Sequence, residues 1–115
     1  MKKFLTLALA LMLTLCLASA FADGLGDPVY IAWVGPLTGD SSNDGITEQN
    51  TLTLAVKAIN DKGGILGHEL VIDYYDDAAN ANEAINIANK IIDEDKYIAV
   101  IGSYTSTTSM NMAYI

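Results

Sequence analysis

Three short apolar runs, each followed by a segment with helical periodicity, constrain the fold of this chain more than any other feature. The runs cover residues 29–34, 69–75 and 97–101, and a glycine or an aspartate ends each of them. Runs of this length are typical of strands that are buried on both faces of a sheet. Strands that alternate with amphipathic helices form parallel sheets with right-handed crossovers. The sequence therefore predicts an α/β fold, with a doubly wound parallel sheet in three layers.

Helical patterns follow each of the three runs. In the first, apolar residues spaced three and four apart extend from Leu52 to Ile59, after a polar loop. The second pattern covers about 81–94 and has Asn80 in the position of an N-cap. The third helix is expected to start near Thr107, within a hydroxyl-rich stretch that supplies caps, and to run to the end of the chain.

The N-terminal segment has the features of a secretory signal peptide. Lys2 and Lys3 precede an apolar run over 4–17, and small residues then provide cleavage sites after Ala20 or Ala22. The run is shorter than the ~20 apolar residues that a membrane span needs, although an uncleaved anchor stays an alternative. We therefore expect a protein that is exported to the periplasm or another extracytoplasmic space.

The predicted cleavage divides the chain into three parts. A signal peptide over 1–22 is expected to leave, residues 23–28 to form a flexible lead-in, and residues 29–115 to form part of a globular lobe. The only cysteine, Cys16, would leave with the signal peptide. Lipid anchoring at Cys16 is the less favoured alternative, because Leu15 before it is bulky where lipoprotein sites favour a small residue.

Composition excludes several classes of function. The net charge is −8 with no arginine, and such a surface repels nucleic acids and anionic lipids. The single histidine, His68, has no cysteine or second histidine to complete a metal site, so we expect no metal and no cofactor. No nucleophile has a basic partner in a recognisable motif, so we expect no enzyme. Asp76 and Asp77 are interpreted as solvated turn residues that cap the next segment, and Trp33 as a core residue.

Two loops are expected to form a ligand site. In doubly wound sheets, ligands bind outside the carboxyl ends of the strands where the direction of winding reverses. The loops that would meet there cover residues 35–45 and 102–109, and both are rich in glycine and hydroxyl side chains. Topology and composition therefore indicate the same place.

Four segments, in order and spacing, resemble one known family, the type I periplasmic solute-binding proteins that serve branched-chain amino acid ABC importers. They are 34–39 with Gly45, 54–67, 74–77, and 100–102 with Ser106, within a match over residues 29–112. The resemblance implies the N-terminal fragment of a two-lobed, leucine-binding-like receptor, with the first three strand–helix units of one lobe. It also implies a branched-chain amino acid, or a related small amino acid or amide, as ligand, and the membrane permease of an ABC importer as partner.

The same resemblance implies a set of site residues. In the family, the loop after the third strand grips the ligand carboxylate with backbone N–H groups and a serine hydroxyl, and Ser106 stands at that position. Thr105 and Thr107 flank it as further donors, and Tyr104 could line the cleft. A plain helix N-cap is the alternative role of Ser106. Asp44 departs from the aromatic residue of many members, and it either meets a ligand cation or is a solvated loop acid.

Two other functions stay open from the residues alone. One is an exported sensory ligand-binding domain, and the other is a flavodoxin-like domain that binds a cofactor. The glycine-rich segment 35–39 matches neither a dinucleotide-binding fingerprint nor a P-loop. The expected export and the absence of arginine disfavour a nucleotide.

Overall fold

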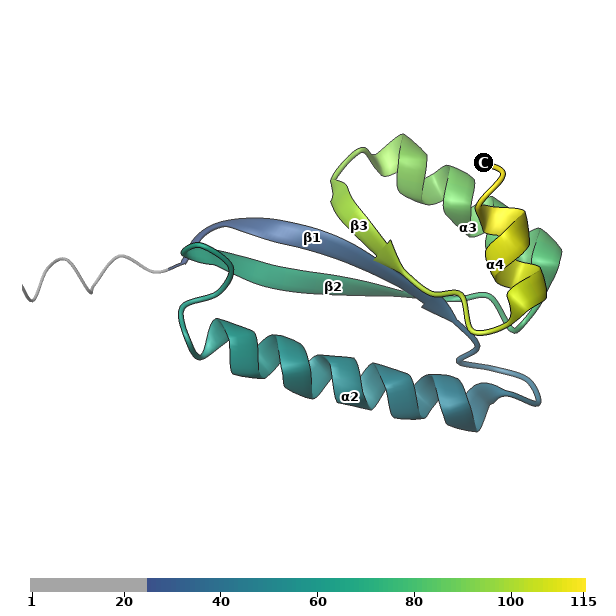
Figure 1. Cartoon of the computed structure of the whole chain (residues 1–115), viewed down its shortest axis with the longest axis horizontal. Coiled ribbons are helices and arrows are strands. Elements are labelled where there is room, and N and C mark those ends of the chain that lie inside the picture. Colours follow the sequence, from purple (N-terminus) through teal and green to yellow (C-terminus); the bar gives the residue numbers. More distant parts are fainter. Residues whose placement is uncertain (1–24) are drawn as a thin grey trace, which may run out of the picture.

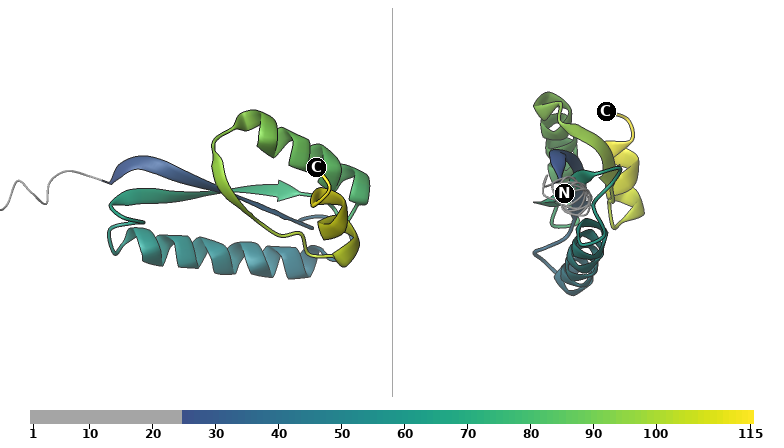
Figure 2. Two further views of the ribbon diagram at one scale, coloured as in Figure 1. Left: turned by 45° about the horizontal axis from the view of Figure 1, so that its top comes forward. Right: turned by 90° about the vertical axis from the view of Figure 1, so that its left-hand side faces the viewer.

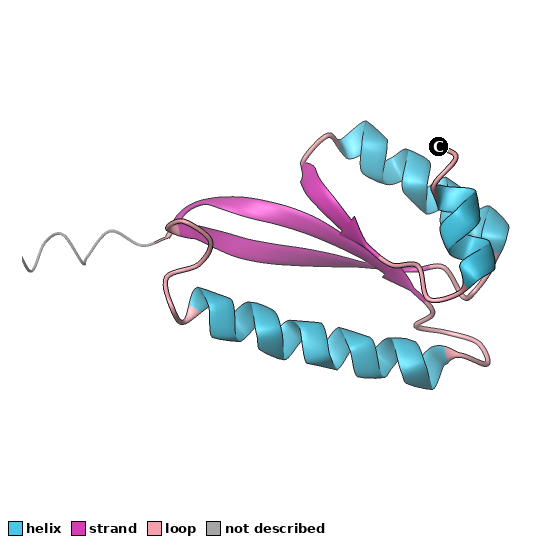
Figure 3. Ribbon diagram, viewed as in Figure 1, coloured by secondary structure: helices cyan, strands magenta, loops and turns pink. Residues whose placement is uncertain are grey.

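A computed structural model describes residues 25–115 of the chain, and the predicted signal peptide lies outside these residues. Figure 3 shows the alternation of strands and helices. In chain order the elements are β1 (Gly26–Gly35), α2 (Ser42–Asn60), β2 (His68–Asp76), α3 (Ala81–Glu94), β3 (Tyr97–Ile101) and α4 (Ser106–Met112). None of these helices is long and apolar enough to cross a membrane.

The three strands form one parallel sheet in the order β2-β1-β3. Helix α2 lies on one face of the sheet, and α3 with α4 beside it lies on the other (Figures 1 and 2). The chain therefore turns to one side of β1 to form β2 and to the other side to form β3. The predicted α/β class, with a doubly wound parallel sheet between two helical layers, is confirmed.

The two faces of β1 pack against different helical layers. Ala32 and Val34 are fully buried and pack with Ile87 and Ile91 of α3. Because side chains alternate along a strand, Trp33 points the opposite way, toward α2, and it is also fully buried as predicted. The core of the described residues therefore lies mainly between β1 and α3.

A side-chain amide connects α2 to β2. The Asn60 Nδ2 donates to the Leu70 carbonyl, and the Leu70 N–H donates to the Asn60 Oδ1, each at 2.9 Å. Both backbone groups of one strand residue point to the same side, so this amide takes the place of a neighbouring strand. These two hydrogen bonds satisfy the backbone N–H and C=O of Leu70 at the edge of β2, and Leu70 is only 5% exposed.

Several expected boundaries are confirmed and others are wrong. α3 has the predicted bounds, with the Asn80 side chain accepting from two amides of the first turn, and β3 also has the predicted bounds. β1 begins at Gly26 rather than Val29, because the Gly26 N–H bonds the Gly67 carbonyl at 2.7 Å, so the end of the expected lead-in is strand. α4 begins at Ser106, one residue early, and ends before the C-terminal residues.

The start of α2 was predicted wrongly. The helix begins at Ser42, within the stretch that was expected to be a polar loop. Its first turn packs closely against the end of β1, because a Cβ at Gly45 would lie 1.9 Å from the Pro36 carbonyl oxygen. Only glycine permits this approach. The polar residues of the turn face solvent and leave no apolar periodicity for a sequence pattern to detect.

Candidate functional site

The loops after β1 and β3 begin side by side at the carboxyl end of the sheet. The two strands are parallel, and Trp33 pairs with Ile101 at the end of their register. Figure 1 shows both loops at the same end of the sheet, next to the start of α2. The predicted meeting of these two loops is therefore confirmed. It rests on topology, since the loops are separated by more than sixty positions in the chain.

Gly102, directly after β3, allows the chain to pack closely against the end of β1. Gly102 has a φ of 121°, a region that other residues rarely adopt. A Cβ there would lie 2.1 Å from the carbonyl oxygen of Val34. Any other residue would push the third loop away from β1, so the contact between the loops depends on this position.

Asp44 and Tyr104 link the start of α2 to the third loop. The phenol of Tyr104 donates to the Asp44 Oδ2 at 2.7 Å. This bond and the negative charge of Asp44 raise the pKa of Tyr104 above its ordinary value. Asp44 is exposed, but its interpretation as a loop acid is wrong, because it lies in the first turn of α2.

Asp76, the last residue of β2, holds the loop after β1. Its carboxylate accepts from the amides of Leu37 and Thr38 at 2.8 and 3.2 Å and from the Thr38 hydroxyl at 2.7 Å. The Ala78 amide donates to the same group at 2.9 Å. Partial burial raises the pKa of Asp76, but the hydrogen bonds, that of the Thr38 hydroxyl foremost, outweigh it and leave the pKa below its usual value. A charged carboxylate therefore fixes the first loop.

Asp77 holds the loop after β3. It is fully buried, so its interpretation as a solvated turn residue is wrong, although it does cap the next segment by accepting from the Ala79 amide at 2.9 Å. The Ser103 hydroxyl donates to the Asp77 Oδ2 at 2.6 Å. That hydroxyl also contacts the hydroxyl of Thr108, which is fully buried in the first turn of α4. Burial of this carboxylate is tolerated because each of its two oxygens accepts a hydrogen bond.

The first turn of α4 presents the predicted carboxylate-binding residues. Thr105 is the N-cap, and its hydroxyl accepts from the Thr108 amide at 3.1 Å. The capping role considered for Ser106 therefore belongs to its neighbour. Ser106 and Thr107 come next with exposed side chains. The turn is thus held from inside by Thr108 while its outer hydroxyls face solvent.

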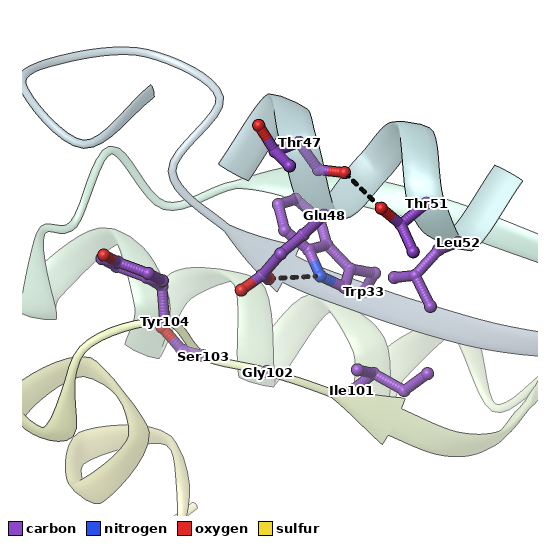
Figure 4. A pocket seen from close by; sticks show the side chains of 9 residues that line it. All are labelled: Trp33, Thr47, Glu48, Thr51, Leu52, Ile101, Gly102, Ser103 and Tyr104. Atoms are coloured by element: carbon purple, nitrogen blue, oxygen red, sulfur yellow. Dashed lines mark hydrogen bonds between the residues drawn. The ribbon is translucent and has the colours of Figure 1, made fainter. Parts of the chain in front are cut away.

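A pocket of about 690 Å³ lies between the first half of α2 and the end of β3 (Figure 4). Tyr104 is the one predicted site residue that lines it. Glu48 accepts a hydrogen bond from the indole of Trp33 at 3.3 Å on its wall. The remaining lining residues are Thr47, Thr51, Leu52, Ile101, Gly102 and Ser103.

Sequence reasoning missed most of this wall. Thr47, Glu48 and Thr51 recur at helical spacing on α2, a polar face that could have indicated a lining. Trp33 was interpreted as a core residue in preference to a cleft residue, and it is both, because it is fully buried and its ring also borders the pocket. No group of three or more His, Cys, Asp or Glu side chains placed to hold a metal occurs within residues 25–115.

Comparison with known proteins identifies the class to which this architecture belongs. Residues 28–115 match the periplasmic binding protein family. The chain therefore belongs to that family, and the resemblance deduced from its four segments is confirmed.

Relatives and solved structures agree with this assignment. The Leu/Ile/Val-binding protein of Escherichia coli is 38% identical over 96 residues, which are 82% of this chain and 26% of the relative. The leucine-specific-binding protein of Salmonella typhimurium is 39% identical over 93 residues, 80% of this chain and 25% of that protein. This chain thus spans about a quarter of the length of the curated relatives it matches.

Two solved structures share the fold. The branched-chain amino acid transporter substrate-binding protein of Streptococcus pneumoniae, in complex with isoleucine, superposes with a TM-score of 0.71 at 26% identity, over 76% of this chain and 25% of that one. A leucine-binding protein of Thermotoga maritima superposes with a TM-score of 0.67 at 31% identity, over 75% and 24%. Both are binding proteins, as are the sequence relatives.

Proposed function

We propose that this chain forms part of the first lobe of an extracytoplasmic receptor that captures a small amino acid for an ABC importer. The ligand class is a branched-chain amino acid or a related small amino acid or amide. The names of the relatives and the isoleucine complex of a solved homologue support this class. We also propose that the N-terminal signal directs export of the chain, and that the chain binds its ligand without converting it chemically.

One observation carries the proposal. Ser106 and Thr107 expose their hydroxyls at the start of α4, next to the carboxyl end of β3, where the two loops meet. The first amides of a helix have no partner within the helix. Hydroxyls and free N–H groups together can bind a carboxylate without a full positive charge. A ligand carboxylate at Ser106 would use both kinds of donor.

The other predicted residues have different roles in this proposal. The Thr105 hydroxyl caps the helix and its carbonyl accepts from Ser109 and Thr108, so its backbone N–H is the group that would contact a ligand. Tyr104 and Asp44 form one hydrogen-bonded pair at the edge of the pocket, and they would contact the ligand side chain together. The carboxylate of this pair would be an acceptor for a ligand with a polar side chain.

A calorimetric titration of the full chain tests the proposal. The probes are L-leucine, L-isoleucine, L-valine, L-threonine, L-glutamine and flavin mononucleotide, one at a time. We expect binding of an amino acid by the unaltered chain and its loss in Ser106→Ala, with no change in the control Asn86→Ala on the exposed face of α3. Thermal shift gives a second reading, because a ligand at a hundred times its Kd stabilises by about 2.7 kcal/mol.

Two results would contradict the proposal. If flavin mononucleotide alone binds, the chain is a cofactor-binding domain of flavodoxin type. If an amino acid binds equally to the unaltered chain and to Ser106→Ala, the carboxylate is held elsewhere and the assignment of the α4 turn is wrong.

A further inference from the structure

The two acids at the end of β2 divide their contacts between the two loops of the candidate site. Asp76 reaches Leu37 and Thr38, which lie 39 and 38 positions earlier in the chain. Asp77 reaches Ser103, which lies 26 positions later. Neighbouring residues at a strand end point to opposite sides, so one dipeptide can serve a loop on each side.

We propose that Asp76 and Asp77 are positioning residues of the ligand site, with Asp76 setting the loop at 37–38 and Asp77 setting the loop at 103–108. The inference rests on the proposed function for what the loops bind. It assigns the placement of the loops themselves to two carboxylates that act through hydrogen bonds to the loops.

Local capping does not account for these contacts. Each acid already accepts a bond from an amide two residues ahead, Ala78 or Ala79. A turn needs no more than that. The additional long-range bonds are charge-assisted and short, at 2.8, 2.7 and 2.6 Å to the Leu37 amide and the hydroxyls of Thr38 and Ser103. Bonds of this kind are about twice as strong as those between neutral groups.

Hydrogen bonds connect Asp77 to the turn that is proposed to bind the ligand. A carboxylate only accepts, so the Ser103 hydroxyl must donate to it and is thereby oriented. Ser103 in turn contacts Thr108, whose amide and hydroxyl both bond Thr105, the N-cap of α4. The Ser103 carbonyl also accepts from the Ser109 hydroxyl at 2.8 Å. The turn that carries the hydroxyls of Ser106 and Thr107 is therefore attached to Asp77 through partly buried hydrogen bonds.

Amide resonances of the full chain test whether Asp76 and Asp77 each position a different loop. We expect Asp76→Ala to shift the ¹H–¹⁵N signals of residues 37–38 and to leave those of 103–108 in place. Asp77→Ala should do the reverse. The control Asp93→Ala removes the same charge from an exposed position of α3 and should shift neither group. General destabilisation would move both groups in each variant, and that result would overturn the proposal.

Ligand affinity gives the second reading, with L-leucine as the probe. We expect Asp77→Ala to weaken binding by roughly tenfold or more, the effect of losing one hydrogen bond to a charged group. Asp77→Asn should recover part of this loss, because its amide can still accept from Ala79 and can donate to the Ser103 oxygen. Equal affinity in all three proteins would refute a positioning role for Asp77.

Two provisions keep the outcomes separate. If Asp77→Ala does not fold, Ser103→Ala removes the same contact from the loop side, and the same loss of affinity is expected. If the unaltered chain binds no L-leucine, the proposed ligand class fails for this probe, while the amide resonances still decide whether each carboxylate holds its own loop.

Discussion

Replacement of Asn60 by alanine should destabilise the fold more than any other change to an asparagine of α2 or α3. The Asn60 amide makes both hydrogen bonds of Leu70 on the open side of β2, each at 2.9 Å. Leu70 is 5% exposed, so water does not readily replace the lost partner. Alanine would leave one donor and one acceptor of the strand unsatisfied.

The size of the effect can be worked out from these two bonds. A typical hydrogen bond contributes about 0.5–1.5 kcal/mol net, and a buried group left unpaired costs about 1–3 kcal/mol. The two unpaired groups of Leu70 would together cost about 2–6 kcal/mol. Relaxation of the loop before β2 would let some water reach Leu70, so the lower part of this range applies. We therefore expect a loss of about 2–4 kcal/mol in the free energy of unfolding. Small domains have about 5–15 kcal/mol in total, so the variant should be visibly weakened.

Urea denaturation followed by circular dichroism measures this loss. With a slope of about 1.5 kcal/mol per molar urea, a loss of about 3 kcal/mol lowers the midpoint by about 2 M. The matched control is Asn89→Ala, because the Asn89 amide bonds only the Ile85 carbonyl on an exposed face of α3. That change should alter stability by less than about 0.5 kcal/mol.

The reasoning about Asn60 has two points at which it can fail. Equal midpoints for Asn60→Ala and Asn89→Ala would show that the amide does not act as a strand partner. Hydrogen exchange of the unaltered chain gives an independent check, since the Leu70 amide should be protected as strongly as the amides paired within the sheet.

Two further predictions concern titrating groups. The Lys96 ammonium, 2.9 Å from the Asp73 carboxylate, and then the Tyr97 hydroxyl hold the pKa of Asp73 below its ordinary value. Ionised Asp73 therefore contributes stability that is present above about pH 4 and is lost as the pH falls through the lowered pKa. Lys96→Met should therefore flatten the decline of the thermal midpoint between about pH 4 and pH 2, and an unchanged decline would contradict the ion pair's role. Asp44→Asn should lower the pKa of Tyr104 toward about 10, measured by NMR of ¹³Cζ-labelled tyrosine, and a constant pKa would show that the bond between the two residues does not persist in solution.

The sequence predicted the sheet well because the elements carry independent local signals. β3 is a continuous apolar run between polar residues, and α3 has both an apolar stripe and the Asn80 cap, so both elements have the predicted bounds. The order of elements then determines that the loops after β1 and β3 meet. No tertiary information was needed for either step.

The errors occur where packing between elements decides the local structure. The start of α2 is polar and has no periodicity, and its position depends on the approach of Gly45 to Pro36. Ser106 and Thr105 differ little in capping propensity, and the choice between them depends on the attachment of Thr108 to Ser103. These contacts form only when neighbouring elements pack against each other, so periodicity along the sequence does not detect them, although the residues are close in the chain.

The misinterpretation of Asp76 and Asp77 has the same cause, because the hydrogen-bond partners of an acid are not apparent from its own position in the sequence. Two adjacent acids after a strand are usually solvated, and solvation would have been the correct interpretation if the loops on either side had lacked donors. Those loops instead supply the amides of Leu37 and Thr38 and the hydroxyls of Thr38 and Ser103. Alternation along β2 already indicated that the two carboxylates face opposite sides. A search for donors in the two loops that flank a strand end, made with that alternation in mind, would have paired each acid with its own loop.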